Sequence, residues 1–276
     1  MDMNNEKKIL YIATSNMFLR TGGGIANCAL YKSLCKNYGG RIDVLHYREC
    51  LPENVREGFI PVPPVDLLKK VLLLIRGKIH RFYPWLDDFL REHAGEYSHC
   101  IINTGLLGDY VSILKGYGIK VAVVHHNFEV EFQKDNRMPS TFWGMSDFLV
   151  RKQESMSYIN ADYNIFLTPD DQQLFHLNYP KTVKENEYVV GIFDNASFDG
   201  SSIPLKGMDS KKLCICGSLN SFQTIHGIEN FREKYLKTLM EFYDDNFSLI
   251  IAGRNPGKQV KDLSEENSNT DCGKSC

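Results

Sequence analysis

The stretch of sequence that decides the fold lies close to the start of the chain. It reads Lys8-Ile-Leu-Tyr-Ile-Ala13, then a short loop, then Thr21-Gly-Gly-Gly-Ile-Ala-Asn27. The apolar run predicts a buried strand, and the residues from Ile25 to Tyr38, closed by Gly39-Gly40, have the pattern of a helix. A buried strand followed by a glycine turn and a helix predicts the first unit of a parallel sheet.

The same alternation of strand and helix continues along the chain. Further strands are expected at Ile42–His46, His99–Asn103, Lys120–Val124, Tyr163–Leu167 and Tyr188–Val190, and helices at Leu106–Gly116, Phe142–Ile159 and Pro169–Leu177. Residues 51–64 predict a proline-bearing loop, and residues 66–92 a largely helical segment that breaks near Pro84. The pattern predicts an α/β fold with a Rossmann-like parallel sheet.

A change of composition predicts a domain boundary. After residue 190 glycine, serine, aspartate and asparagine become frequent, as in an interdomain linker. We therefore expect a Rossmann-like domain over residues 1–195, a linker over 196–210, the start of a second Rossmann-like domain over 211–263 and a polar tail over 264–276. The second domain begins with strands at Lys212–Cys216 and Phe247–Ala252 and a helix at Ile228–Tyr243, which is too little for an independent core.

The composition limits the kinds of partner. The chain has 276 residues, of which 43% are hydrophobic and 24% charged, as in ordinary globular proteins, and its net charge of -2 gives no reason to expect nucleic acid. Most of its eight cysteines are expected to be buried free thiols. Since Cys214-x-Cys216 has no second pair at zinc spacing, we expect no bound metal.

The glycine run is the first candidate for a binding site. Gly22, Gly23 and Gly24 follow the carboxyl end of a strand, where open α/β sheets bind ligands. Glycine lets the backbone approach a ligand closely, and a helix N-terminus attracts phosphate. A dinucleotide fingerprint fits less well, because Asn27 stands at its third glycine and the second strand ends without an acid for ribose. A plain turn between strand and helix is the alternative.

A second polar cluster follows the strand at Lys120–Val124. It reads His125-His-Asn-Phe-Glu129, and its imidazole, amide and carboxylate groups can bind sugar hydroxyls or relay a proton. Because side chains alternate along a strand, His125 and His126 should face opposite sides and should not share a metal ion. The alternative is one buried, hydrogen-bonded histidine and a helix cap supplied by Asn127.

Residues 66–83 form the third unusual segment. They combine a wide apolar face with Lys69, Lys70, Arg76, Lys78 and Arg81, and such a helix can lie on an anionic membrane surface. A helix that packs on the core and keeps its lysines solvated is the alternative. The apolar stretch is too short to span a bilayer, and the polar start of the chain does not read as a signal peptide. We expect a cytoplasmic protein that can contact the inner membrane face peripherally.

The last expected strand ends in Ala252-Gly-Arg-Asn-Pro-Gly-Lys258, which joins a glycine turn to two basic residues. Arg254 and Lys258 there suit a nucleotide diphosphate, and exposed surface charge explains them equally well.

Three stretches of this layout resemble the retaining GT-B glycosyltransferases usually called family 4. Lys8–Asn27 is similar to the family's first strand and glycine loop, and Val121–Glu129 to its strand followed by a His-Asn-x-Glu segment. The most specific likeness is Cys216-Gly-Ser-Leu-Asn220 with Gly227-Ile-Glu-Asn-Phe231, followed by Leu249–Pro256, which resembles the start of the donor domain.

The resemblance implies a site as well as a fold. The glycine loop would lie near the donor diphosphate and the acceptor in an interdomain cleft, with Asn127 and Glu129 beside it. His126 would be the catalytic-site residue that contacts the transferred sugar or its leaving phosphate. Gly217, Ser218 and Arg254 would approach the diphosphate. Such enzymes transfer a sugar from a nucleotide-sugar donor to a glycan or lipid-linked acceptor, and usually need no metal or other cofactor.

The sequence also departs from the family pattern. The stretch Asn220–His226 lacks the arginine and lysine that similar enzymes often place there. The paired-glutamate segment that binds the donor would lie beyond Cys276, so we expect this chain alone to transfer sugar poorly or not at all. Two other functions stay open: a non-catalytic Rossmann-like binding module, and a dinucleotide-dependent oxidoreductase.

Overall fold

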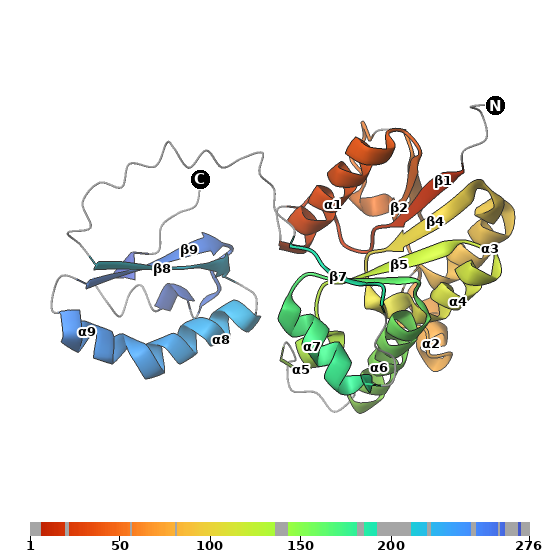
Figure 1. The fold of residues 1–276 in the computed structure, drawn as a ribbon. Helices are drawn as coiled ribbons and strands as arrows, with labels where there is room; N and C mark the ends of the chain where they lie inside the picture. Colours follow the sequence, from red (N-terminus) through yellow and green to blue (C-terminus); the bar gives the residue numbers. More distant parts are fainter. Residues whose placement is uncertain are drawn as a thin grey trace. The chain divides into compact units, whose positions relative to one another are not determined.

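The computed structural model describes residues 7–19, 22–55, 57–80, 82–135, 143–180, 185–191, 211–219, 222–243, 247–258, 260–262 and 270–271. The chain divides into two compact units, the first made of residues 1–134 and 139–196 and the second mainly of residues from 197 onward (Figure 1). The expected linker over 196–210 and most of the expected tail over 264–276 lie outside the described residues.

The first unit contains a seven-stranded parallel sheet, which confirms the predicted α/β fold. Its strands are β1 (Lys8–Ile12), β2 (Ile42–Tyr47), β3 (Phe59–Val62), β4 (Tyr97–Ile102), β5 (Lys120–His125), β6 (Tyr163–Phe166) and β7 (Glu187–Val189). They are ordered β3-β2-β1-β4-β5-β6-β7. Because all neighbours are parallel, the carboxyl ends of these strands meet at one edge of the sheet.

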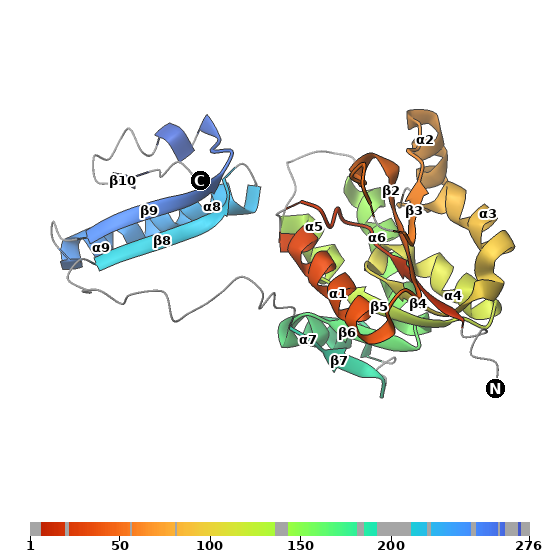
Figure 2. The same cartoon turned by 90° about the horizontal axis from the view of Figure 1, so that it is seen from above.

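Helices cover the two faces of this sheet (Figure 2). They are α1 (Gly22–Tyr38), α2 (Leu67–Ile75), α3 (Tyr83–His93), α4 (Gly108–Gly116), α5 (Glu129–Asp135), α6 (Trp143–Asn160) and α7 (Pro169–Asn178), with short 3-10 turns at Arg48–Cys50, Ala94–Glu96 and Gly105–Leu107. The alternation of β1 assigns the faces: Ile9 and Tyr11 pack with α1, whereas Leu10 and Ile12 pack with α3 and α4. Burial of each such side chain stabilises the fold by roughly 1.5–3 kcal/mol.

Three details differ from the sequence prediction. The expected loop over 51–64 contains β3, in which Pro61 is tolerated because an edge strand does not need its missing N–H. The segment over 66–92 breaks at Gly77, whose φ is +73°, and Pro84 lies in the first turn of α3. Helix α1 begins at Gly22 instead of Ile25, so the glycine run forms its first turn.

The second unit has a parallel sheet of its own. It contains β8 (Lys211–Ser218), β9 (Phe247–Arg254) and the short β10 (Thr270–Asp271), ordered β10-β9-β8. Between β8 and β9 run α8 (Phe222–Phe231), a π-helical turn at Arg232–Leu236, and α9 (Lys237–Tyr243). A small core packs α8 on β9 through Ile228 and Ile251. This is the strand, helix, strand unit that the sequence predicts.

Two glycines of α4, one packed against α6 and one exposed to open space, test the close packing of these helices. A Cβ on Gly108 would lie 2.2 Å from the Gln153 carbonyl oxygen of α6, whereas one on Gly116 would meet nothing within 4 Å. We expect Gly108→Ala to lower the free energy of unfolding by about 1–3 kcal/mol. Gly116→Ala, the control on the same helix, should leave it unchanged or raise it by up to about 1 kcal/mol. Urea unfolding measures both, and equal losses would contradict the packing described.

Candidate functional site

A pocket of about 430 Å³ opens at the carboxyl edge of the first sheet. It is lined by Thr14, Ser15, Gly22, Gly23, Ala26, Asn103, Thr104, His126, Asn127, Glu129, Phe132 and Leu167. These residues follow β1, β4, β5 and β6 or belong to the first turns of α1 and α5. The glycine run and the histidine cluster, which lie about a hundred residues apart in the sequence, therefore line one pocket.

The three glycines of α1 have different surroundings. A Cβ on Gly24 would lie 2.2 Å from the Leu19 carbonyl oxygen, so only glycine fits there. A Cβ on Gly23 would be 3.9 Å from the Ser15 hydroxyl, and one on Gly22 would meet nothing within 4 Å. Gly24 is therefore required for packing. Gly22 and Gly23 line the pocket with the backbone of the first turn of this 17-residue helix. Such a turn offers backbone amides and positive potential to an anion.

A buried network of amides fixes the position of His126. The Asn103 amide donates to Asn27 Oδ1 at 2.5 Å, and the Tyr11 hydroxyl donates to the same oxygen. The Asn27 amide donates to the Ser15 carbonyl oxygen at 2.8 Å and to its hydroxyl at 2.9 Å. Since the Asn103 amide nitrogen is used as a donor, its Oδ1 accepts from His126 Nε2.

This arrangement selects one form of the His126 ring. Burial lowers its pKa below the usual range, against the opposing charge of Asp171, so the ring is neutral near pH 7. With its proton on Nε2, the neutral ring has Nδ1 as a hydrogen-bond acceptor. A neutral imidazole in a fixed tautomer can accept a hydrogen bond from a sugar hydroxyl.

His125 lies in a different environment from its neighbour. It is 1% exposed, its ring is 4.5 Å from that of Phe175 and 5.1 Å from that of Phe166, and its Nε2 lies 2.9 Å from Asn164 Oδ1. Burial lowers its pKa to about 4. The strand alternation therefore places His125 in the core and His126 at the pocket, as expected. Among the described residues, no group of three or more potential metal ligands is found.

Acidic side chains surround the start of α5, beside the pocket. The amide of Phe128 donates to Asp171 Oδ1 at 3.1 Å, and the amide of Glu129 donates to Glu154 Oε1 at 2.5 Å. Burial raises the pKa of Glu129 to about 7, with a hydrogen bond from Asn127 opposing it, and burial raises the pKa of Glu154 to about 8. Glu129, which lines the pocket, can thus gain or lose a proton near neutral pH.

Several of these residues were missed by the sequence prediction. Asn103 and Thr104 follow the carboxyl end of β4, so the reasoning that selected His126 at the end of β5 would have found them too. Glu154 lies in the middle of α6, where its position in a long helix carries no signal of its role.

The remaining predicted site residues belong to the second unit. Gly217 and Ser218 end β8, paired with Gly253 and Arg254 at the end of β9. A Cβ on Gly217 would lie 2.8 Å from the Thr224 hydroxyl of α8, so this glycine is explained by packing. The side chain of Arg254 lies outside the described residues.

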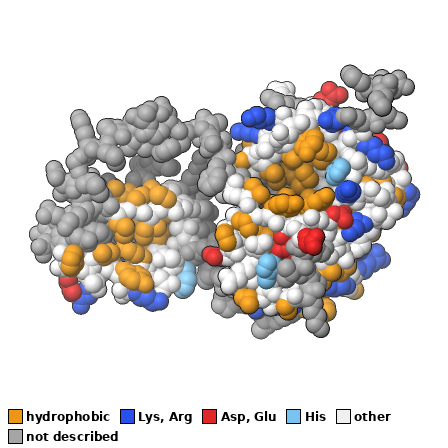
Figure 3. Space-filling model, viewed as in Figure 1, with side chains coloured by type: hydrophobic (Ala, Val, Ile, Leu, Met, Phe, Trp, Pro, Cys, Tyr) orange, Lys and Arg blue, Asp and Glu red, His pale blue; other side chains and the backbone are white. Residues whose placement is uncertain are grey.

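Two other hollows lie near the amino ends of the strands in the first unit, with volumes of about 390 Å³ and 170 Å³. Tyr38 and His99 border both, and the larger one is also bordered by Lys7 and Arg41. On the face drawn in Figure 3, hydrophobic side chains of this unit gather in a patch bordered by basic side chains and a histidine. Open α/β sheets bind ligands at the opposite edge, so we assign the candidate site to the pocket that contains His126.

Comparisons with solved structures bear on the fold. Sucrose-phosphate synthase from Thermosynechococcus elongatus matches with a TM-score of 0.57 and 14% identity, over 96% of this chain and 70% of that one. Phytolacca americana UGT2, in complex with UDP-2fluoro-glucose and pterostilbene, matches with a TM-score of 0.52 and 11% identity, over 96% and 70%. A UDP-glucosyltransferase from Polygonum tinctorium matches with a TM-score of 0.50 and 12% identity, over 97% of this chain and 71% of that one.

These likenesses extend over both units. The chain has a GT-B fold. No protein-family model and no curated protein matches the sequence. At these identities the likenesses show the GT-B fold alone, so the narrower resemblance to family 4 stays a prediction.

The buried carboxyl groups predict how the stability of this GT-B protein depends on pH. The folded-state pKa of Glu154 lies above its ordinary value of 4.5, so the native state keeps a proton that the unfolded chain releases. The stability that the protonated acid contributes is present below about pH 4.5 and is lost as the pH rises toward about 8. We expect the free energy of unfolding to fall by about 5 kcal/mol over this interval.

Glu154→Gln supplies a neutral acceptor of similar shape, so its stability should fall less steeply with pH. Glu131→Gln, an exposed change on α5, is the control and should keep the wild-type slope. Urea unfolding at several pH values measures the slopes. Parallel profiles for the Glu154 variant and the wild type would show that this carboxyl group is not protonated in the native state.

Proposed function

We propose that this chain acts in sugar transfer, moving a sugar from a nucleotide-sugar donor to a glycan or lipid-linked acceptor. The observation that carries the proposal is the pocket at the carboxyl edge of a GT-B first unit, where the first turn of α1 and a neutral histidine in a fixed tautomer converge. In the transfer, the bond from the anomeric carbon to the diphosphate breaks and a bond to an acceptor oxygen forms. Such a reaction needs hydroxyl binding and stabilisation of the leaving diphosphate.

The described residues suit these two tasks. His126 accepts a hydrogen bond from a hydroxyl of the transferred sugar, and Asn127 and Glu129 offer further polar groups on the same wall. The amides of Gly22 and Gly23 suit the negative charge of the diphosphate. For Gly217, Ser218 and Arg254, contact with a nucleotide diphosphate stays a prediction from the resemblance to family 4.

The proposal includes the donor, the stereochemistry and the location. Two of the similar structures carry UDP, UDP-sugar or a UDP-sugar-dependent activity in their names, which makes UDP-sugars the first donors to test. Retention of configuration follows from the resemblance to family 4. We propose a reaction without a metal or other cofactor, because helix termini and basic side chains can stabilise the leaving diphosphate. A cytoplasmic location suits a nucleotide-sugar donor.

Binding of the donor sugar tests the proposal directly. A panel of UDP-sugars, UDP and nicotinamide cofactors is added to the chain, and the midpoint of thermal unfolding is followed. We expect a UDP-sugar to raise Tm by a few degrees more than UDP does, because the sugar adds contacts in the pocket. His126→Ala should remove this difference and leave the UDP effect.

His99→Ala is the matched control, since His99 is exposed at the amino end of β4. It should keep the full difference between UDP-sugar and UDP. An unchanged difference in His126→Ala would refute the assigned role, and a rise with nicotinamide cofactors alone would favour an oxidoreductase.

A further inference from the structure

Helix α2 exposes an apolar face to solvent. Leu67, Leu68 and Ile75 are 78%, 77% and 73% exposed, and Val71, Leu72 and Leu74 are between 43% and 49% exposed. Only Leu73 of this helix packs against the core of the first unit. The alternative of a core-packing helix is therefore wrong for most of its apolar residues.

The exposed residues lie on one side of α2. At about 100° per residue, the six exposed apolar side chains span an arc of roughly 160°, and Leu73 lies opposite its centre. Lys70 lies at one border of this arc, and Lys69 and Arg76 lie beyond the other. An apolar face bordered by basic side chains is the pattern of helices that lie in a membrane interface, because long basic side chains reach the headgroups while the apolar face is buried.

Two basic hollows flank the helix. One of about 350 Å³ includes Lys70, Lys78 and His80. The other, of about 310 Å³, includes Lys69, Arg76 and Lys78, with Asp87 as its acidic member. Leu73 lines both hollows, so they lie along the side of α2 that faces the protein and leave the apolar face uncovered.

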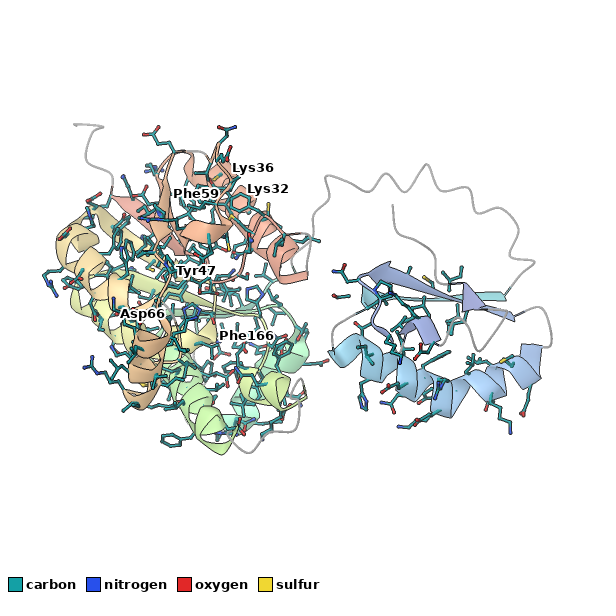
Figure 4. The ribbon with its side chains drawn as sticks, turned by 180° about the vertical axis from the view of Figure 1, so that it is seen from behind. Lys32, Lys36, Tyr47, Phe59, Asp66 and Phe166 are labelled. Carbon is teal, nitrogen blue, oxygen red and sulfur yellow. The ribbon has the colours of Figure 1, made fainter. Side chains whose placement is uncertain are left out.

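The acidic side chains near α2 are occupied within the protein. Asp66, labelled at the start of the helix in Figure 4, accepts a hydrogen bond from the Lys69 amide at 2.8 Å. Asp87 accepts a hydrogen bond from the Tyr110 hydroxyl at 2.7 Å. Lys69 Nζ also lies 3.7 Å from Asp66 Oδ2, and Lys78 Nζ lies 4.8 Å from the centre of the Tyr83 ring. Lys70 and Arg76 are therefore the basic side chains on which the docking proposal rests.

We propose that α2 docks the protein on an anionic lipid bilayer. Its apolar face enters the boundary between headgroups and acyl chains, and Lys70 and Arg76 at the two borders of that face contact lipid phosphates. Charge complementarity favours this occupant over a second copy of the chain, since pairing two such helices would bring their basic borders together. None of the described helices has the length and apolarity needed to span a bilayer, so the contact is peripheral.

The docking proposal rests on α2 alone and not on sugar transfer, but α2 and the pocket share one edge of the sheet. Helix α2 follows the carboxyl end of β3, and the pocket opens at the carboxyl ends of β1, β4 and β5 in the same parallel sheet. The docking helix and the pocket therefore start from the same edge of the first unit.

Vesicle cosedimentation of the full chain tests the proposal. The vesicles contain phosphatidylcholine alone, or phosphatidylcholine mixed equally with phosphatidylglycerol. We expect binding to the mixed vesicles that weakens as NaCl is added. Leu67→Ser with Leu68→Ser should lower the partition coefficient at least about tenfold, and Lys70→Gln with Arg76→Gln should lower it roughly fivefold per charge.

Matched controls come from other exposed helices. Leu177→Ser on α7, where Leu177 is 67% exposed, and Lys32→Gln with Lys36→Gln on α1 should bind like the wild type. Circular dichroism confirms that each variant is folded. Absent binding, equal binding to both kinds of vesicle, or α2 variants that bind like the wild type would overturn the proposal. A dimer in analytical ultracentrifugation that is lost in Leu67→Ser with Leu68→Ser would overturn it in favour of self-association.

Discussion

The buried side chain of Asn27 is the contact on which the candidate site depends. It joins the first turns of α1 to Tyr11 of β1, to Ser15 and, through Asn103, to the end of β4. An unpaired buried amide costs about 1–3 kcal/mol, so the loss of one of these partners would lower the stability of the fold by about that amount. Asn27 occupies the position where a dinucleotide-binding fingerprint has its third glycine. The same residue therefore argues against dinucleotide binding and forms the centre of this hydrogen-bond network.

The network also explains why the pocket can have a defined chemistry. Because the Asn103 amide nitrogen donates to Asn27, Asn103 Oδ1 accepts from His126 Nε2, and this holds the His126 ring in one tautomer. On the other side, Glu154 holds the start of α5 and thereby the wall formed by Glu129. Because burial disfavours charge on His126 and Glu129, the pocket presents a neutral imidazole and a carboxyl group that is partly protonated near pH 7, and both can bind sugar hydroxyls.

Much of the first unit could be predicted from the sequence because its strands are short apolar runs between turn residues. The rule that open α/β sheets bind ligands at the carboxyl ends of their strands also selected Gly23 and His126, which line one pocket. It missed β3, since Pro61 argues against a strand unless the strand is known to lie at a sheet edge. Glu154 could not be found, because only tertiary packing brings the middle of α6 to the start of α5. The different surroundings of Gly24 and Gly23 are likewise set by the chain around Leu19.

The most direct test of the central claim is a nuclear magnetic resonance titration, with a UDP-sugar, of the chain labelled at glycine and histidine. The account predicts that the amide resonances of Gly22 and Gly23 shift together with the imidazole resonances of His126. Resonances of Gly40 and Gly116, where a Cβ would meet nothing within 4 Å, should not move. Shifts that leave Gly22, Gly23 and His126 unchanged while the ligand binds elsewhere would contradict the assignment of the sugar site to this pocket.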